Sequence, residues 1–202
     1  MIVFDKKISN IKAGAFYILF TLIPVLTITS CTGNLRNANL SVERTGTVAG
    51  KKKVAVLPFN NISGRTDAGR IVTNLFVTEL FNSGRFVVIE PGNILQFMRE
   101  ERVKVLGEID LVKLQLLSRR FDLDGVIVGT VLEFNDGTKG ARALPVVSMN
   151  ARMIEPVEGR IVWSAQDKKE GADFITIFGQ GRVRAITSLA QKIIRNFIYT
   201  IM

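Results

Sequence analysis

The sequence contains no histidine and only one cysteine, Cys31, among its 202 residues. A lone cysteine cannot form an internal disulfide, and structural zinc sites need several cysteine or histidine ligands, so both kinds of cross-link are excluded. The lack of histidine also removes the commonest general base of hydrolases. We therefore expect a protein that is stabilised by its hydrophobic core, with no catalytic residues, metal or cofactor.

The composition is that of an ordinary folded domain, with 47% hydrophobic and 22% charged residues. The net charge of +9 favours anionic neighbours such as lipid headgroups or acidic envelope polymers. The basic residues of the chain are scattered, and they lack the interleaved aromatic residues of a groove that binds single-stranded nucleic acid. Nucleic acid is therefore not an expected partner.

Residues 1–30 have the layout of a secretory signal peptide, in which basic residues precede a short apolar stretch. The apolar stretch covers residues 13–28 and is interrupted by Pro24. A membrane-spanning helix would need about 20 continuous apolar residues. Cleavage after export therefore fits this segment better than spanning.

The residues before Cys31 resemble a bacterial lipobox, since Ile28, Thr29 and Ser30 supply an aliphatic residue followed by two small ones. This resemblance implies cleavage between Ser30 and Cys31 and attachment of lipid to the Cys31 thiol. Two or three acyl chains would anchor the chain durably in a membrane. The competing interpretation is that Cys31 is an ordinary residue of an uncleaved anchor helix. Thr32 stands where the enteric inner-membrane signal has Asp, so the expected location is the outer membrane, facing the periplasm.

Residues 31–52 are polar and contain glycine, which predicts a flexible, lipidated tether. Residues 53–202 alternate between strand and helix patterns and form the expected folded domain. The expected strands cover residues 54–59, 86–89, 125–134, 146–154 and 160–164. The expected helices run from Asp67 to about residue 82, from Pro91 onward, over 110–121, and from about residue 181 onward.

This order, β-α-β-α-α-β-β-β-α, predicts an α/β fold with a mixed sheet layered with helices. The early alternation implies parallel crossover connections, whereas the later hairpin must be antiparallel. A more segregated α+β arrangement is the alternative.

Several local patterns could carry chemistry, and each has a plainer interpretation. Asp122 and Asp124 could form a carboxylate pair or a solvated turn, and Gly179 to Gly181 could be a phosphate-binding turn or only a helix start. The loop from Ser63 to Thr66 follows the first strand, where α/β folds often bind ligands, but could equally be an ordinary connection. Trp163 is expected to pack on the sheet or in the core.

Four segments carry a family resemblance. They are VAVLPFNNISG, LFNSGRFVVIEPGNILQFMREE, FDLDGVIVGTVLEF and ARMIEPVEGRIVWSA. In this order they resemble the CsgG-type curli assembly and transport lipoproteins and, more distantly, the LpoB-type activators of penicillin-binding proteins. The resemblance covers residues 53–197. It implies an αβ sandwich on the periplasmic side of a membrane, with a role in assembly, secretion or regulation of envelope machinery.

The secretion branch of that family contributes two membrane-spanning hairpins per subunit, and each spanning strand needs about 9 to 11 residues. Only 11 residues separate Phe134 from Val146, and the segment after Ser164 is mostly charged in its first half. We therefore expect a chain that lacks the pore-forming hairpins.

The expected function is a non-enzymatic accessory, assembly or regulatory binding protein of the envelope. Its expected partners are the membrane, through the lipid anchor, and an envelope protein, and a homo-oligomer is left open. One alternative is a subunit of a curli-type outer-membrane secretion channel. Another is an enzyme acting on an envelope polymer, whose candidate carboxylates are Asp122, Asp124, Glu133 and Asp173.

Overall fold

The computed structural model describes residues 50–103, 109–137, 144–175 and 181–201. The expected signal peptide, Cys31 and the tether as far as residue 49 lie outside the described residues, as do Gly179 and Gln180. Within the described ranges, no helix combines the length and the apolar character needed to cross a bilayer.

The described residues form four helices and six strands, in the expected order with one short strand added. The helices are α2 (Ala68–Ser83), α3 (Pro91–Glu100), α4 (Leu111–Phe121) and α5 (Ile186–Thr200). The strands are β1 (Lys52–Val56), β2 (Asn60–Asn61), β3 (Phe86–Val88), β4 (Gly125–Asn135), β5 (Val146–Ile154) and β6 (Ile161–Glu170). The added strand is β2, which is too short to leave a pattern in the sequence.

The strands form one mixed sheet in the order β3-β1-β4-β5-β6, with β2 paired to β4 outside this path. Strand β1 runs parallel to both β3 and β4. Strand β5 is antiparallel to both of its neighbours, β4 and β6. The predicted α/β fold with a mixed sheet is therefore confirmed.

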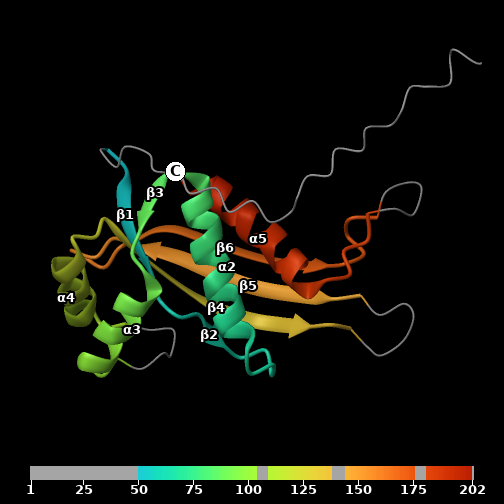
Figure 1. Ribbon diagram of the computed structural model, residues 1–202, viewed down its shortest axis with the longest axis horizontal. Coiled ribbons are helices and arrows are strands. Elements are labelled where there is room, and N and C mark those ends of the chain that lie inside the picture. Colours follow the sequence, from blue (N-terminus) through green and yellow to red (C-terminus); the bar gives the residue numbers. More distant parts are fainter. Residues whose placement is uncertain (1–49, 104–108, 138–143, 176–180, 202) are drawn as a thin grey trace, which may run out of the picture. The chain divides into compact units, whose positions relative to one another are not determined.

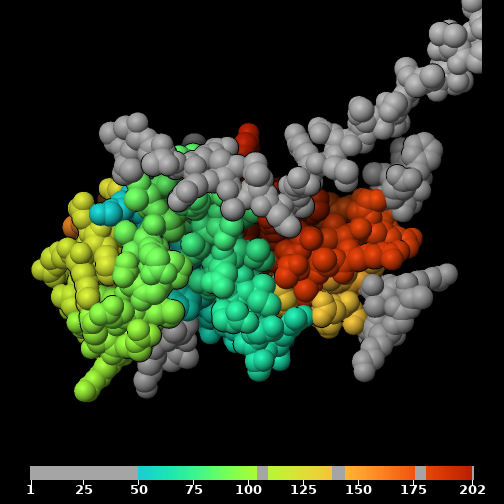
Figure 2. Space-filling view, viewed as in Figure 1, coloured from blue at the N-terminus to red at the C-terminus, as the bar shows by residue number. Residues whose placement is uncertain are grey.

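Helices cover both faces of the sheet (Figure 1). Helices α2 and α5 pack on one face, and their buried side chains share a core with β4 and β5. Helices α3 and α4 pack on the other face against β1 and the first half of β4, in a second core. The space-filling view shows α2 and α5 side by side on the face turned to the viewer (Figure 2). The site described below lies where α2 begins.

Three predicted boundaries were wrong. The first strand was expected over residues 54–59, but β1 covers Lys52–Val56. The last strand was expected over residues 160–164, but β6 continues to Glu170, and its last four residues are charged. The charges are tolerated because β6 lies at the edge of the sheet and exposes alternate side chains to solvent. Helix α5 begins at Ile186 instead of near residue 181. Val183 is buried but donates its backbone N–H to the carbonyl of Gly171 at 3.1 Å, so it belongs to an extended segment before the helix.

The ends of α2 agree only in part with expectation. Gly84 ends the helix with φ of 67°, a left-handed conformation that glycine adopts without strain. Asp67 stands at the N-cap position, but its carboxylate accepts no hydrogen bond from the first turn. That carboxylate is held by a neighbouring arginine instead.

Candidate functional site

The candidate site is the loop between β2 and α2, residues 62–67, which includes the stretch from Ser63 to Thr66 singled out in the sequence. Strand β2 pairs in parallel with Thr130 and Val131 of β4. The backbone N–H of Ile62 then donates to the carbonyl of Val131 at 3.0 Å. The 62–67 loop therefore starts from a point that is fixed on the sheet.

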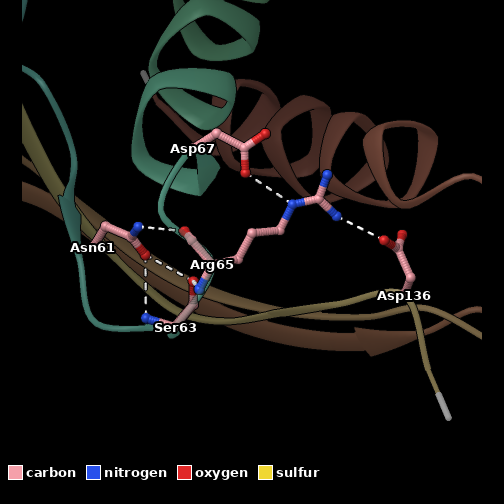
Figure 3. Close-up of polar contacts among 5 residues, drawn as sticks. All are labelled: Asn61, Ser63, Arg65, Asp67 and Asp136. Carbon is pink, nitrogen blue, oxygen red and sulfur yellow. Dashed lines mark hydrogen bonds and ion pairs between the residues drawn. The ribbon is translucent and has the colours of Figure 1, made fainter.

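The side chain of Asn61 organises the first half of this loop (Figure 3). Its Oδ1 accepts hydrogen bonds from the backbone N–H of Ser63 at 3.1 Å and from Ser63 Oγ at 2.7 Å. Its Nδ2 donates to the carbonyl of Arg65 at 2.6 Å. Gly64 has φ of 79°, a left-handed conformation that favours glycine. One amide side chain thus satisfies several backbone and hydroxyl groups of the turn.

Arg65 closes the second half of the loop and ties it to the end of β4 (Figure 3). Its Nε donates to Asp67 Oδ1 at 2.8 Å, and its Nη1 donates to Asp136 Oδ2 at 2.7 Å. The guanidinium also lies over the ring of Phe134, 5.4 Å from the ring centroid. The hydrogen bond between Arg65 and Asp67 raises the pKa of Arg65 and lowers the pKa of Asp67.

The buried hydroxyl group of Thr73 fixes the segment that leads into the 62–67 loop. Thr73 of α2 is 7% exposed and accepts the backbone N–H of Phe59 at 2.9 Å, while donating to the carbonyl of Gly69 at 2.7 Å. The ring of Phe59 packs against that of Phe76, with centroids 5.3 Å apart. The segment leading into the loop is therefore anchored on α2.

This arrangement favours a protein contact over a small anionic ligand. One guanidinium faces two carboxylates, so the Arg65, Asp67 and Asp136 cluster carries a net negative charge. Its polar groups already bond to one another. Beside them, the side chain of Ile62 is 62% exposed on a loop whose backbone is held in place. The loop presents an ordered apolar side chain to solvent.

The other sequence candidates have structural roles. Asp122 ends α4 in a left-handed conformation with φ of 54°, and Asp124 Oδ2 accepts the backbone N–H of Lys53 at 2.6 Å. Trp163 packs edge-on against Phe197, with ring centroids 6.0 Å apart, and its Nε1 donates to Thr200 Oγ1 at 3.1 Å. The packing role predicted for Trp163 is confirmed.

The remaining candidate carboxylates have separate partners. Glu133 accepts from Lys168 Nζ at 2.7 Å across the sheet, and Asp173 Oδ2 accepts the backbone N–H of Glu170 at 2.8 Å. Over the described part of the chain, no three cysteine or carboxylate side chains gather in a way that could hold a metal ion.

Sequence reasoning missed two pairs that the fold brings together. Asp136 lies 71 residues from Arg65. Glu79 and Arg195 lie 116 residues apart and join α2 to α5. Neither pairing has a local pattern, because each depends on how the helices and strands pack.

Several solved structures share this fold. The PelC dodecamer from Paraburkholderia phytofirmans is 19% identical with a TM-score of 0.52, and the match covers 76% of this chain and 90% of that one. Lipoprotein GNA1162 from Neisseria meningitidis is 16% identical with a TM-score of 0.53, covering 74% of this chain and 97% of that one. The LpoB C-terminal domain from Salmonella enterica is a weaker match, with 16% identity, a TM-score of 0.44, and 62% and 86% coverage.

A comparison with curated protein sequences finds no match. The model of one protein family, described as curli production assembly/transport component CsgG, matches residues 36–177. This match spans well over half of the chain and includes every strand and the first three described helices. The protein therefore belongs to the CsgG family.

Proposed function

We propose that this protein is a lipid-anchored lipoprotein of the bacterial cell envelope that acts without catalysis, by docking on a protein of the assembly or secretion machinery. In this proposal residues 1–30 are removed, lipid on Cys31 holds the chain in the outer membrane facing the periplasm, and the residues from Cys31 to the start of β1 form the tether. The domain that follows carries the docking surface.

The family match supports this role, since the family is described as a curli assembly and transport component. GNA1162, which shares the fold, is itself described as a lipoprotein. The signal layout and the lipobox before Cys31 support export and anchoring independently of these relatives.

The observation that carries the docking function is the ordered 62–67 loop with its exposed Ile62. A loop that is already held by Asn61 and Arg65 loses little conformational freedom when it binds. An apolar side chain on such a loop gains free energy from burial in a partner's pocket. We therefore place Ile62 at the centre of the contact.

In-cell photo-crosslinking tests this contact. A photo-reactive amino acid is placed at Thr66, an exposed position of the same loop, in the full chain expressed in its native host. We expect a defined adduct with an envelope protein, identified by mass spectrometry. The substitution Ile62→Asp should reduce that adduct about tenfold, because it removes the apolar contact and adds a charge that must be desolvated.

The matched control is Val157→Asp, since Val157 is 67% exposed and lies in the turn between β5 and β6. This control should leave the adduct unchanged. An adduct that survives Ile62→Asp, or that falls equally with both substitutions, would contradict a docking role for the loop.

The second candidate function is a homo-oligomeric assembly such as a secretion channel, favoured by the description of PelC as a dodecamer. In that case the adduct from Thr66 would contain two copies of this chain. Size-exclusion chromatography with light scattering on the detergent-solubilised protein would then give a ring-sized mass instead of a monomer.

A further inference from the structure

A pocket of about 280 Å³ opens between the last turns of α2 and α5, at the opposite end of α2 from the 62–67 loop. Both helices end at the same edge of the domain, near the C-terminus (Figure 1). Two arginines, Arg85 and Arg195, contribute to its wall together with Ile198 and Tyr199. None of these residues takes part in the docking loop.

Arg195 is held in place by a buried carboxylate. Glu79 is 7% exposed, and it accepts hydrogen bonds from Arg195 Nε at 2.9 Å and Nη2 at 3.3 Å. Gln191 Nε2 donates to the same carboxylate at 2.5 Å. The Arg195 side chain is nevertheless 62% exposed, so its guanidinium is fixed on one side and open to solvent on the other.

Arg85 is fixed by the end of α5. Its Nη1 donates to the carbonyl of Ile198 at 3.0 Å, and its guanidinium lies over the ring of Phe86, 5.5 Å from the centroid. This carbonyl belongs to the last turn of α5, where a cation is electrostatically favoured. A guanidinium has five N–H donors, so the bond to Ile198 leaves further donors for a ligand.

The rest of the wall provides apolar contact and neutral polar groups. Ile198 is 4% exposed, whereas Tyr199 is 85% exposed, a high value for an aromatic side chain in an ordered helix. Asn82 and Ser83 complete the lining. A ligand with both an anionic group and an apolar flank would meet complementary groups at this position.

Charge and size together limit what the pocket can hold. Two guanidiniums and one carboxylate give a side-chain charge of about +1, and the C-terminal ends of α2 and α5, each equivalent to about −0.5 of a charge, offset much of it. The small remaining field suits a single carboxylate that bonds directly to guanidinium N–H donors better than a doubly charged phosphate. The volume is close to the lower end of the range of about 300–1,000 Å³ that is typical of small-molecule pockets. It suits one side chain and its neighbour in a peptide.

We propose that this pocket binds an acidic peptide segment of a protein partner, with the carboxylate of a Glu or Asp side chain between Arg85 and Arg195 and an adjacent apolar side chain on Tyr199. Residues 1–30 hold three lysines and one aspartate, so the chain that begins at Cys31 has 24 basic and 17 acidic residues, and its net charge of +7 favours such a partner over long range. This inference rests on the proposed function only in requiring a protein partner, and it concerns a different surface.

Peptide titration followed by NMR tests the proposal on the full chain in detergent. The probe is a blocked Gly-Leu-Glu-Gly peptide, and the comparison probe is Gly-Leu-Gln-Gly. We expect saturable shifts of the backbone amides of Asn82, Arg85 and Tyr199 with the Glu peptide, and binding at least about fivefold weaker with the Gln peptide. Because the assay uses purified protein, its result is independent of the crosslinking at Thr66.

Two variants locate the contact. Arg85→Ala and Tyr199→Ala should each weaken binding of the Glu peptide about fivefold or more, and Tyr199 is exposed enough that its replacement spares the core. The charge-matched control is Arg70→Ala, because Arg70 is exposed on α2, about 20 Å along the helix from the pocket. This control should bind as the unaltered protein does.

Equal binding of the Glu and Gln peptides, or binding that survives Arg85→Ala, would overturn the proposal. Vesicles of phosphatidylglycerol and inorganic phosphate are titrated in parallel. If either produces the same amide shifts at a lower concentration than the Glu peptide, the pocket is a phosphate or lipid-headgroup site and the peptide assignment is wrong.

Discussion

The guanidinium of Arg65 donates from Nη1 to Asp136 Oδ2 at 2.7 Å and thereby joins the loop before α2 to the chain that leaves β4. The two residues are 71 positions apart in the sequence. Both ends of the bond are partly exposed, with side-chain exposures of 36% and 66%. Such a bond contributes little to global stability but restrains the local position of the loop.

Replacing Arg65 should therefore loosen the loop without unfolding the domain. In Arg65→Ala, amide hydrogen exchange of the peptide covering residues 60–67 should become about tenfold faster, because local opening no longer breaks two ion pairs. Hydrogen exchange with mass spectrometry measures this directly. Arg119→Ala, an exposed arginine on α4, serves as the control, and equal exchange in both variants would contradict the restraint.

The same contact makes a prediction about pH. The hydrogen bond from Arg65 lowers the pKa of Asp67 from its ordinary value of 3.8. Because the folded pKa lies below the unfolded one, the stabilisation is fully present above the unfolded value and is lost as the pH falls through the folded value. In NMR titrations of the Asp67 carboxyl carbon, Arg65→Ala should raise the Asp67 pKa toward 3.8. An unchanged pKa would show that Arg65 is not the cause.

The ion pair between α2 and α5 should matter more for stability. Arg195→Ala removes the hydrogen bonds that Arg195 donates to the buried carboxylate of Glu79 and leaves the hydrogen bond from Gln191 in place. We expect a loss of about 1–2 kcal/mol in the free energy of unfolding, since hydrogen bonds to charged groups contribute about 1.5–3 kcal/mol and Arg195 is partly solvent-exposed. Urea denaturation measures the loss. A variant no less stable than Arg119→Ala would contradict this role.

Gly129 is expected to be the least replaceable glycine of the sheet. A Cβ at this position in β4 would lie 2.6 Å from the carbonyl oxygen of Asn150 and would overlap the ring of Phe59. Gly129→Ala should therefore cost about 3 kcal/mol, at the upper end of overpacking effects.

Gly92 provides the matched control for this substitution. A Cβ at Gly92 meets only the carboxylate of Glu90, at 2.7 Å. That carboxylate caps α3 by accepting the backbone N–H of Asn93 at 3.0 Å, so Gly92→Ala should cost no more than about 1 kcal/mol, the typical value of a lost cap. Thermal unfolding compares the two variants, and similar melting temperatures would contradict the close packing around Gly129.

Most of the fold was predictable because its elements have strong local signals. Apolar β-branched runs predicted β1 and β4, and periodic apolar residues predicted α2 and α4. Strand β6 was predicted too short, because an edge strand tolerates charges that hydrophobicity alone assigns to a loop. Strand β2 was missed because two residues carry no pattern.

The sequence predicted where the candidate site lies in the fold, but not the contacts that it makes. The loop after the first strand was singled out from the general geometry of α/β folds. What that loop does depends on Asp136, which comes from a distant part of the chain just after β4, and on the exposure of Ile62, which no sequence pattern reports. The pairing of Glu79 with Arg195 likewise requires the packing of α2 against α5 to be known.

The proposed function depends most on the anchoring of the chain at Cys31, because export and envelope location both follow from it. Mass spectrometry of the protein purified from membranes of its native host measures this directly. We expect a mature chain that begins at Cys31 and carries a diacylglyceryl group on the thiol. A chain that begins at any other residue, or a Cys31 with a free thiol, would contradict it.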